Sequence, residues 1–240
     1  MVAMKKPVGE ITRGTTNPNR LRRIDRYLTQ LSHLRTLSNP LAVDLGYGRT
    51  PVTAVELLAR LEKVAPGIRV LGIEIDPARV IEAKALEHSR LVFEHGGFEV
   101  PIPKTFSDRD DVDLIRALNV LRQYSESEVL AAWALMQSRL SKEGLIIEGT
   151  SDEIGRVASW ITLNKDQPLT FTISLRLQGL ERPSKVAERL PKILIHKNTP
   201  GNKIHQFLKE LDLAWEKAAG FGAFGSAQRF VQTAKTLTQA

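Results

Sequence analysis

The sequence predicts an α/β fold in which helices cover both faces of a doubly wound, mostly parallel sheet. Short apolar runs at 41–43, 69–74 and 113–118 have the composition of strands that are buried on both faces. Helical patterns alternate with these runs, as in a chain of strand–helix–strand units. The first run leads through a glycine turn directly into a helix, which is typical of a nucleotide site at the carboxyl edge of such a sheet.

The composition is that of an ordinary soluble protein, with 42% hydrophobic and 25% charged residues in a chain of 240. The absence of cysteine excludes disulfides, thiolate metal sites and a cysteine nucleophile, and no other metal-ligand cluster stands out. No apolar run approaches the roughly eighteen residues of a membrane span, and residues 1–7 lack the apolar core of a signal peptide. We therefore expect a cytoplasmic protein with no membrane partner.

The glycine turn after the first predicted strand favours a cationic ligand over a dinucleotide. Asp44 ends the strand, and Gly46 and Gly48 allow a tight turn that a ligand can approach closely. A dinucleotide fingerprint needs a third glycine where strand and helix pack together, and Pro51 occupies that place. An acid two residues before the first glycine is also unsuited to a pyrophosphate. Thr50 is a candidate N-cap, with Pro51 at the first helical position.

The segment 44–48, Asp-Leu-Gly-Tyr-Gly, resembles motif I of the class I S-adenosylmethionine-dependent methyltransferases, and 72–77, Gly-Ile-Glu-Ile-Asp-Pro, looks like their second motif. The resemblance covers roughly residues 38–178. It implies a Rossmann-like fold, S-adenosyl-L-methionine as cofactor and methyltransferase activity. It also implies that the turn wraps the methionine end of the cofactor and that Glu74 accepts from its ribose hydroxyls. The candidate cofactor-binding residues are Asp44, Gly46, Tyr47, Gly48, Glu74, Ile75, Gly97, Phe98 and Asn119.

The segment after the third predicted strand departs from the family pattern. Many family members place an acid there, often directly after a glycine, to meet the adenine amino group. In this chain Gly97 stands at the matching position and Glu99 follows two residues later. We expect Phe98 to cover the adenine face and its backbone N–H to bond the adenine edge. We interpret His95 in the same segment as structural rather than as a catalytic base.

Asn119 is the candidate catalytic residue, because it follows the strand over 113–118, where the family places groups that meet the acceptor atom. Its amide offers a donor and an acceptor with which to orient a nitrogen or oxygen acceptor. The stretch lacks the Asp/Asn-Pro-Pro-Tyr motif of amino-group methyltransferases. We expect the acceptor to enter over Asn119, between the N-terminal segment and the closing strands of the sheet.

The charge is unevenly distributed along the chain. Residues 1–36 hold eight basic and two acidic residues, and 182–240 hold ten and four, so each end carries +6 against −5 for the middle and +7 overall. Such basic N- and C-terminal segments are compatible with RNA as the substrate, since phosphate contacts give sequence-independent affinity. Ordinary solvated surface charge explains the same pattern equally well.

The remaining patterns complete the predicted architecture. Antiparallel closing strands are expected at 157–163 and 169–177, and Ser125 with Glu128 forms a capping box. We predict a basic N-terminal segment over 1–37, a cofactor-binding domain over 38–178 and a helical C-terminal extension over 179–240. Helices are predicted at 19–35, 51–64, 77–87, 125–140, 184–194, 202–218 and 223–238, with further strands at 91–93 and 145–150.

The sequence thus predicts a methyltransferase that acts on a nitrogen or oxygen acceptor, with RNA as the favoured substrate. One alternative is a small-molecule methyltransferase. Another is a non-catalytic protein that keeps the fold and binds S-adenosylmethionine or RNA. A nicotinamide-dependent oxidoreductase is disfavoured by Asp44 and Pro51.

Overall fold

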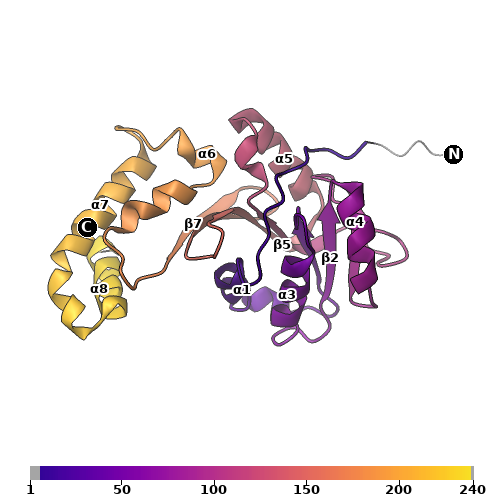
Figure 1. Cartoon of the computed structure of the whole chain (residues 1–240), viewed down its shortest axis with the longest axis horizontal. Helices are drawn as coiled ribbons and strands as arrows, with labels where there is room; N and C mark the ends of the chain where they lie inside the picture. Colours follow the sequence, from indigo (N-terminus) through magenta and orange to yellow (C-terminus); the bar gives the residue numbers. More distant parts are fainter. Residues whose placement is uncertain (1–5, 239–240) are drawn as a thin grey trace.

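The computed structural model describes residues 6–238, so residues 1–5 of the predicted N-terminal segment and residues 239–240 lie outside it. A seven-stranded sheet runs through the middle of the molecule in the order β3-β2-β1-β4-β5-β6-β7 (Figure 1). The first five strands are parallel, and β6 and β7 each run antiparallel to the strand before them. The strands are β1 Leu41–Leu45, β2 Arg69–Glu74, β3 Leu91–His95, β4 Val112–Leu118, β5 Leu140–Ser151, β6 Val157–Leu163 and β7 Pro168–Leu175.

The sheet confirms the predicted fold class. Strand order reverses between β1 and β4, so the chain winds outward from this point in both directions. Doubly wound sheets bind ligands at such a switch point, outside the carboxyl ends of the strands. The turn after β1 and the segment after β4 therefore meet where a site is expected.

Both faces of the parallel strands are buried, which explains their nearly unbroken apolar runs. Leu41 and Val43 of β1 belong to one core cluster, and Ala42 between them belongs to another. Helix α5 covers the first face, and helices α1, α3 and α4 cover the second. The helices of this part of the chain are α1 Arg22–Leu28, α2 Ser32–Thr36, α3 Val52–Leu61, α4 Pro77–Ala83 and α5 Glu126–Ser138, with 3-10 turns η1 Lys84–Leu86 and η2 Leu121–Gln123.

The C-terminal segment packs on the antiparallel edge of the sheet, at one end of the molecule (Figure 1). A third core cluster joins Val157 and Leu175 to apolar residues of this segment, such as Leu208. This confirms the expected helical extension, while the boundaries at 37/38 and 178/179 stay a prediction. The elements are η3 Pro183–Arg189, α6 Lys192–Ile195, α7 Lys203–Lys217, η4 Ala219–Phe224 and α8 Ser226–Thr238. None of the helices described is long and apolar enough to span a membrane.

Three local predictions were wrong. The helix expected over 19–35 is interrupted after Leu28, where the Thr29 hydroxyl donates to the carbonyl of Arg26 and competes with the backbone. The helix expected over 184–194 is a 3-10 segment followed by a short turn of α-helix, because Pro191 disfavours helical geometry at the residue before it. Thr50 is not the N-cap of helix α3, because Pro51 occupies the N-cap position and the helix begins after it.

Two helices begin with side-chain caps, and the cap of α5 was predicted from the sequence. The Asp76 side chain accepts from the Ala78 N–H at 3.0 Å, with Pro77 in the first helical position of α4. Ser125 and Glu128 form the complete capping box of α5.

Candidate active site at the carboxyl edge of the sheet

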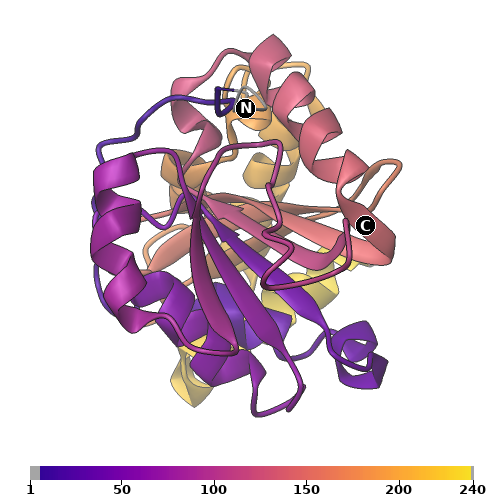
Figure 2. The same cartoon turned by 90° about the vertical axis from the view of Figure 1, so that its right-hand side faces the viewer.

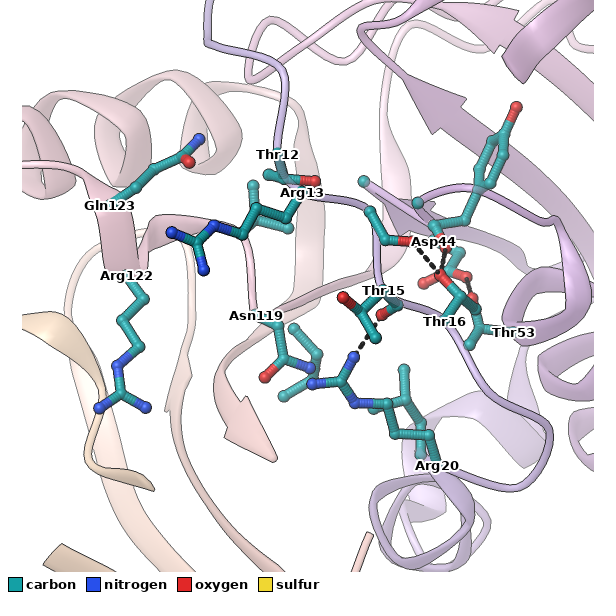
Figure 3. Close-up of a pocket in the computed structure, with 17 residues that line it drawn as sticks. Thr12, Arg13, Thr15, Thr16, Arg20, Asp44, Thr53, Asn119, Arg122 and Gln123 are labelled. Atoms are coloured by element: carbon teal, nitrogen blue, oxygen red, sulfur yellow. Dashed lines mark hydrogen bonds between the residues drawn. The ribbon is translucent and has the colours of Figure 1, made fainter. Parts of the chain in front are cut away.

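A cavity of about 480 Å³ opens at the switch point between β1 and β4 (Figure 3). Asp44, Gly46 and Gly48 line it from the β1 side, and Asn119 lines it from the β4 side. The third wall is the segment that precedes α1, including Arg13 and neighbouring threonines. The cavity therefore brings together the predicted glycine turn and the predicted catalytic residue, which are far apart in sequence.

The glycines of the turn have the backbone geometry that the sequence predicts. Gly46 and Gly48 have φ angles of 69° and 85°, in the region that favours glycine. The Gly46 N–H donates to the carbonyl of Ile73 at 2.7 Å, which fastens the turn to the end of β2. A side chain at Gly48 would overlap the hydroxyl of Thr16. In this structure the group that closely approaches Gly48 is therefore Thr16 of the same chain.

Tyr47, between the two glycines, turns its side chain away from the cavity. Its ring packs edge-on against Phe93 at 5.3 Å, and burial raises the pKa of its phenol. The Tyr47 carbonyl accepts from the Thr16 hydroxyl at 2.9 Å. At this position only the backbone faces the site.

Asp44 is held by a buried arginine that sequence analysis missed. The Arg116 guanidinium, on β4, makes a two-pronged contact with the Asp44 carboxylate at 2.8 and 3.0 Å. Thr53 donates its hydroxyl to Asp44 at 2.7 Å. Arg116 also contacts Asp25 of α1, and Asp25 in turn pairs with Arg60 at 2.6 Å. We call Asp25, Asp44, Arg60 and Arg116 the buried ion network.

The buried ion network sets the charge beneath the cavity. Arg116 and Asp25 have no exposed surface, and Asp44 is 2% exposed. Burial opposes the charge of Arg116, but Asp25 and Asp44 together raise the pKa of its guanidinium. Asp44 is therefore a neutralised anchor of the turn, with both oxygens engaged. A charged residue within the apolar run 113–118 was the sequence signal for this network, because a buried cation needs acidic partners.

Glu74 ends β2 as predicted, with its carboxylate directed to backbone N–H groups. It is 2% exposed and accepts from the Gly48 N–H at 2.8 Å and from the Ile75 N–H at 3.1 Å. Arg79 of α4 approaches the same carboxylate at 3.4 Å. Glu74 thus ties β2 to the glycine turn. His95 donates its Nε2–H to the carbonyl of Ile75 at 3.0 Å, which agrees with its interpretation as structural.

The predicted adenosine half of the site is covered by residues 8–16, which we call the strap. The Phe98 N–H, expected at the adenine edge, donates to the carbonyl of Val8 at 2.9 Å. A side chain at Gly97 would overlap the same carbonyl. Only about 20 Å³ of open space is left between the strap, Glu74, Ile75 and Phe98. This contact could not be predicted from the sequence, because an extended segment has no periodicity.

Asn119 stands at the bottom of the cavity in a strained conformation (Figure 3). Its φ of 65° is uncommon for a residue with a side chain, although asparagine tolerates it better than most. Its side-chain oxygen, Oδ1, accepts from the Ser151 N–H at 2.9 Å, and its Nδ2 donates to the Ser151 hydroxyl at 3.2 Å. Ser151 therefore fixes the amide plane and leaves one N–H of Nδ2 for another partner.

Three arginines surround Asn119 (Figure 3). Arg20 is 8% exposed and donates only to carbonyls, among them those of Ser151 and Asp152. Burial lowers the pKa of Arg20, and Glu153 offsets this in part. Arg13 and Arg122 are exposed at the rim and donate to no other side chain within residues 6–238. The cavity wall is therefore positively charged.

Several solved structures are similar to this chain over about half of its length. Human N-acetylserotonin methyltransferase in complex with SAM is 21% identical, over 54% of this chain and 34% of that one, with a TM-score of 0.40. Magnesium protoporphyrin IX methyltransferase from Synechocystis PCC 6803, with bound SAH, is 18% identical over 54% and 53%, with a TM-score of 0.41. Mitomycin 7-O-methyltransferase is 22% identical over 47% and 31%, with a TM-score of 0.37.

All three are methyltransferases. Each likeness is one of fold over about half of this chain. The chain spans between about a third and a half of their lengths. No protein-family model and no curated protein matches the sequence.

The two halves of the site differ in how they suit S-adenosylmethionine. The methionine half is open, and the glycine turn and the Asn119 side-chain amide border it. In the predicted adenosine half, the strap lies against Glu74, Ile75 and Phe98. No group of metal ligands occurs among the described residues.

Proposed function

We propose that the chain is an S-adenosylmethionine-dependent methyltransferase that modifies a nitrogen or oxygen atom of a small, negatively charged molecule. The observation that carries this proposal is the meeting of the acid–glycine turn and Asn119 in one cavity at the switch point. The residues that would hold the cofactor are Gly46 and Gly48 at its methionine end and Glu74 and Phe98 at its adenosine end. The cofactor supplies an electrophilic methyl group on a sulfonium.

Asn119 has the features of a residue that orients the acceptor. Ser151 fixes both ends of its amide, so the remaining N–H points in one direction. A fixed donor lowers the entropy that an acceptor atom loses on alignment. Methyl transfer to a nucleophilic nitrogen or oxygen needs little acid–base help, so Asn119 would act by positioning.

The size of the cavity supports a small acceptor over RNA. About 480 Å³ lies within the range of roughly 300–1,000 Å³ that small-molecule sites occupy. The two basic ends of the chain also lie apart. Helices α7 and α8 stand at one end of the molecule, while the strap crosses the carboxyl edge of the parallel strands (Figure 1). The positive charges of the two ends of the chain therefore do not combine at the cavity.

The charge of the wall supports an anionic acceptor. Arg13, Arg20 and Arg122 line the cavity, and its single acid, Asp44, is neutralised by Arg116. The two rim arginines donate to no other side chain of the described residues, and guanidinium groups bind carboxylates and phosphates with two parallel hydrogen bonds. A neutral or cationic acceptor would leave these charges uncompensated.

Calorimetric titration with S-adenosylhomocysteine tests the cofactor. We expect binding in the micromolar range, about 8 kcal/mol, and no binding of NAD. Glu74→Ala should weaken binding at least about tenfold, because a buried acceptor is removed. Glu143→Ala, an exposed position on β5, is the matched control and should bind as the unaltered chain does. A folded chain that binds NAD, or that fails to bind S-adenosylhomocysteine, would overturn the proposal.

Transfer of a labelled methyl group to a metabolite extract tests the acceptor. We expect the label in the fraction that an anion-exchange column retains. Arg122→Gln should raise KM for that acceptor by about tenfold, the value of one charge-assisted hydrogen bond, and leave KM for the methyl donor unchanged. Arg22→Gln, an exposed arginine of α1, is the control. Label found only in RNA or in unretained compounds would contradict an anionic small acceptor.

A non-catalytic protein that binds the cofactor is the second candidate. It is favoured by the strap over the adenosine half and by the engagement of both Asp44 oxygens. Tight binding of S-adenosylhomocysteine with no transfer of label to any fraction would support this non-catalytic candidate over the enzyme.

A further inference from the structure

The strap contacts the carboxyl edge of the sheet through its backbone at several successive points. Arg79 donates to the carbonyl of Thr12 at 3.0 Å, and the Arg49 N–H donates to the carbonyl of Gly14 at 2.9 Å. The Gln123 side chain and the Tyr124 hydroxyl contact the backbone of Glu10. The strap therefore lies over the site as a continuous, hydrogen-bonded segment rather than as a loose end (Figure 2).

The contact at Val8 has the hydrogen-bond pattern of an adenine edge. Its carbonyl accepts from the Phe98 N–H, and its own N–H donates to the Glu99 carboxylate, each at 2.9 Å. Adenine presents the same pair, an exocyclic amino donor beside a ring nitrogen acceptor. The Glu99 carboxylate is therefore placed to accept from the adenine amino group. This is the role of the acid that the family pattern has near the position of Gly97.

Gly9 lies in the slot that an adenine ring would need. Its surroundings are the side chains of Ile75, Phe98 and Tyr124, each within 3.4 Å of the position a β-carbon would take. Its φ of 140° is open to glycine and rare for other residues. A flat peptide without a side chain therefore fills an apolar slot between two aromatic rings and an isoleucine.

We propose that the strap occupies the adenosine half of the site in place of the cofactor, with Val8 on the Phe98–Glu99 edge and Gly9 in the ring slot, so that the two compete. This inference rests on the proposed function. When the strap lies in place, S-adenosylmethionine cannot reach Phe98 and Glu99. Cofactor binding therefore requires the strap to leave, and Phe98 and Glu99 then accept the adenine edge.

The competition lowers the apparent affinity for the cofactor. A ligand that binds only an open form is weakened by the fraction of chains that are open. A strap that is closed nine times in ten would weaken binding about tenfold. The strap also carries Arg13, so its release changes the acceptor cavity together with the adenosine half.

The substitution Gly9→Val, made in the full chain, tests the effect of the strap without altering the cofactor residues. Valine is strained at a φ of 140° and would crowd Ile75, Phe98 and Tyr124, so it should expel the strap while every proposed cofactor residue keeps its own side chain. Gly179→Val is the matched control, because Gly179 also has a positive φ and has open space around it. We expect calorimetry to show about tenfold tighter binding of S-adenosylhomocysteine for Gly9→Val and no change in affinity for Gly179→Val.

The outcomes separate the strap from the proposed function. If the unaltered chain and Gly9→Val bind S-adenosylhomocysteine equally, or Gly9→Val binds more weakly, the competition is wrong and the proposed function stands. If neither binds, both are wrong. Hydrogen exchange on the unaltered chain gives an independent reading: S-adenosylhomocysteine should speed exchange at the Val8 and Glu10 amides. Unchanged or slower exchange there, in a chain that binds, would overturn the competition even if the variants failed to fold.

Discussion

At the scale of single residues, burial and the neighbouring groups determine the role of two acidic side chains, Asp44 and Glu148. Asp44 stands where the acid of the family motif stands, yet its carboxylate is engaged by Arg116 and Thr53. Glu148, on β5, is buried with its Oε2 atom lacking a hydrogen-bond partner among the described residues. One acid is paired with a buried cation, and burial drives the other toward its neutral form.

Glu148 should make the protein less stable as pH rises. Burial raises its pKa to about 8, and Trp133 opposes this shift only in part. Because the folded pKa exceeds the unfolded value of 4.5, the folded chain binds the proton more tightly. The free energy of unfolding should therefore fall between pH 4.5 and about 8, by about 3 kcal/mol at pH 7.

Urea denaturation of Glu148→Gln against the unaltered chain measures this effect. The variant cannot ionise, so its stability relative to the unaltered chain should grow from pH 4.5 to 8. Glu143→Gln, at an exposed position, should show no such trend. A difference between Glu148→Gln and the unaltered chain that stays constant across this range would contradict the prediction.

At the scale of elements, the buried ion network joins pieces that are distant in sequence. Arg116 of β4 contacts Asp25 of α1, Asp44 at the end of β1 and the carbonyl of Thr53 in α3. It thereby fixes the glycine turn against the helices of one face. A buried cation with both acids in place is satisfied, and removing it leaves the buried Asp44 carboxylate without a cation and Asp25 with Arg60 alone.

Arg116→Met should lower the free energy of unfolding by about 3–5 kcal/mol, the usual cost of breaking a buried ion pair on one side. Neutralising both acids as well, with Asp25→Asn and Asp44→Asn, should recover part of this loss. Arg90→Met breaks an exposed pair with Glu62 and should cost less than about 1 kcal/mol. Equal losses for Arg116→Met and Arg90→Met in chemical denaturation would refute the role of the network.

Elements with a strong pattern could be predicted from the sequence, and those without one could not. The strands over 69–74 and 157–163 were found at the predicted residues, because apolar runs identify them. The helix expected over 19–35 was wrong at Thr29, where a single hydroxyl interrupts a good periodic pattern. The strap has no pattern at all, since its contacts are made by backbone atoms that every sequence has.

At the scale of the whole molecule, the topology brings the site together. Asp44 and Asn119 were predicted as site residues from local sequence, and the reversal of strand order puts them on one cavity. The positive wall could be predicted only in part, because Arg13 and Arg20 belong to the basic N-terminal segment, whereas Arg122 follows β4 and meets them only in the folded chain. The basic charge of the N-terminal segment therefore belongs in part to the cavity rather than to an outer surface.

The most direct test of the account is a titration of the ¹⁵N-labelled chain with S-adenosylhomocysteine, followed amide by amide. Shifts should concentrate at the Gly46, Gly48, Phe98 and Asn119 amides and saturate with one affinity, and NAD should leave these amides unchanged. Shifts that avoid this set, or that appear only in the C-terminal helices, would contradict a cofactor site at the carboxyl edge of the sheet.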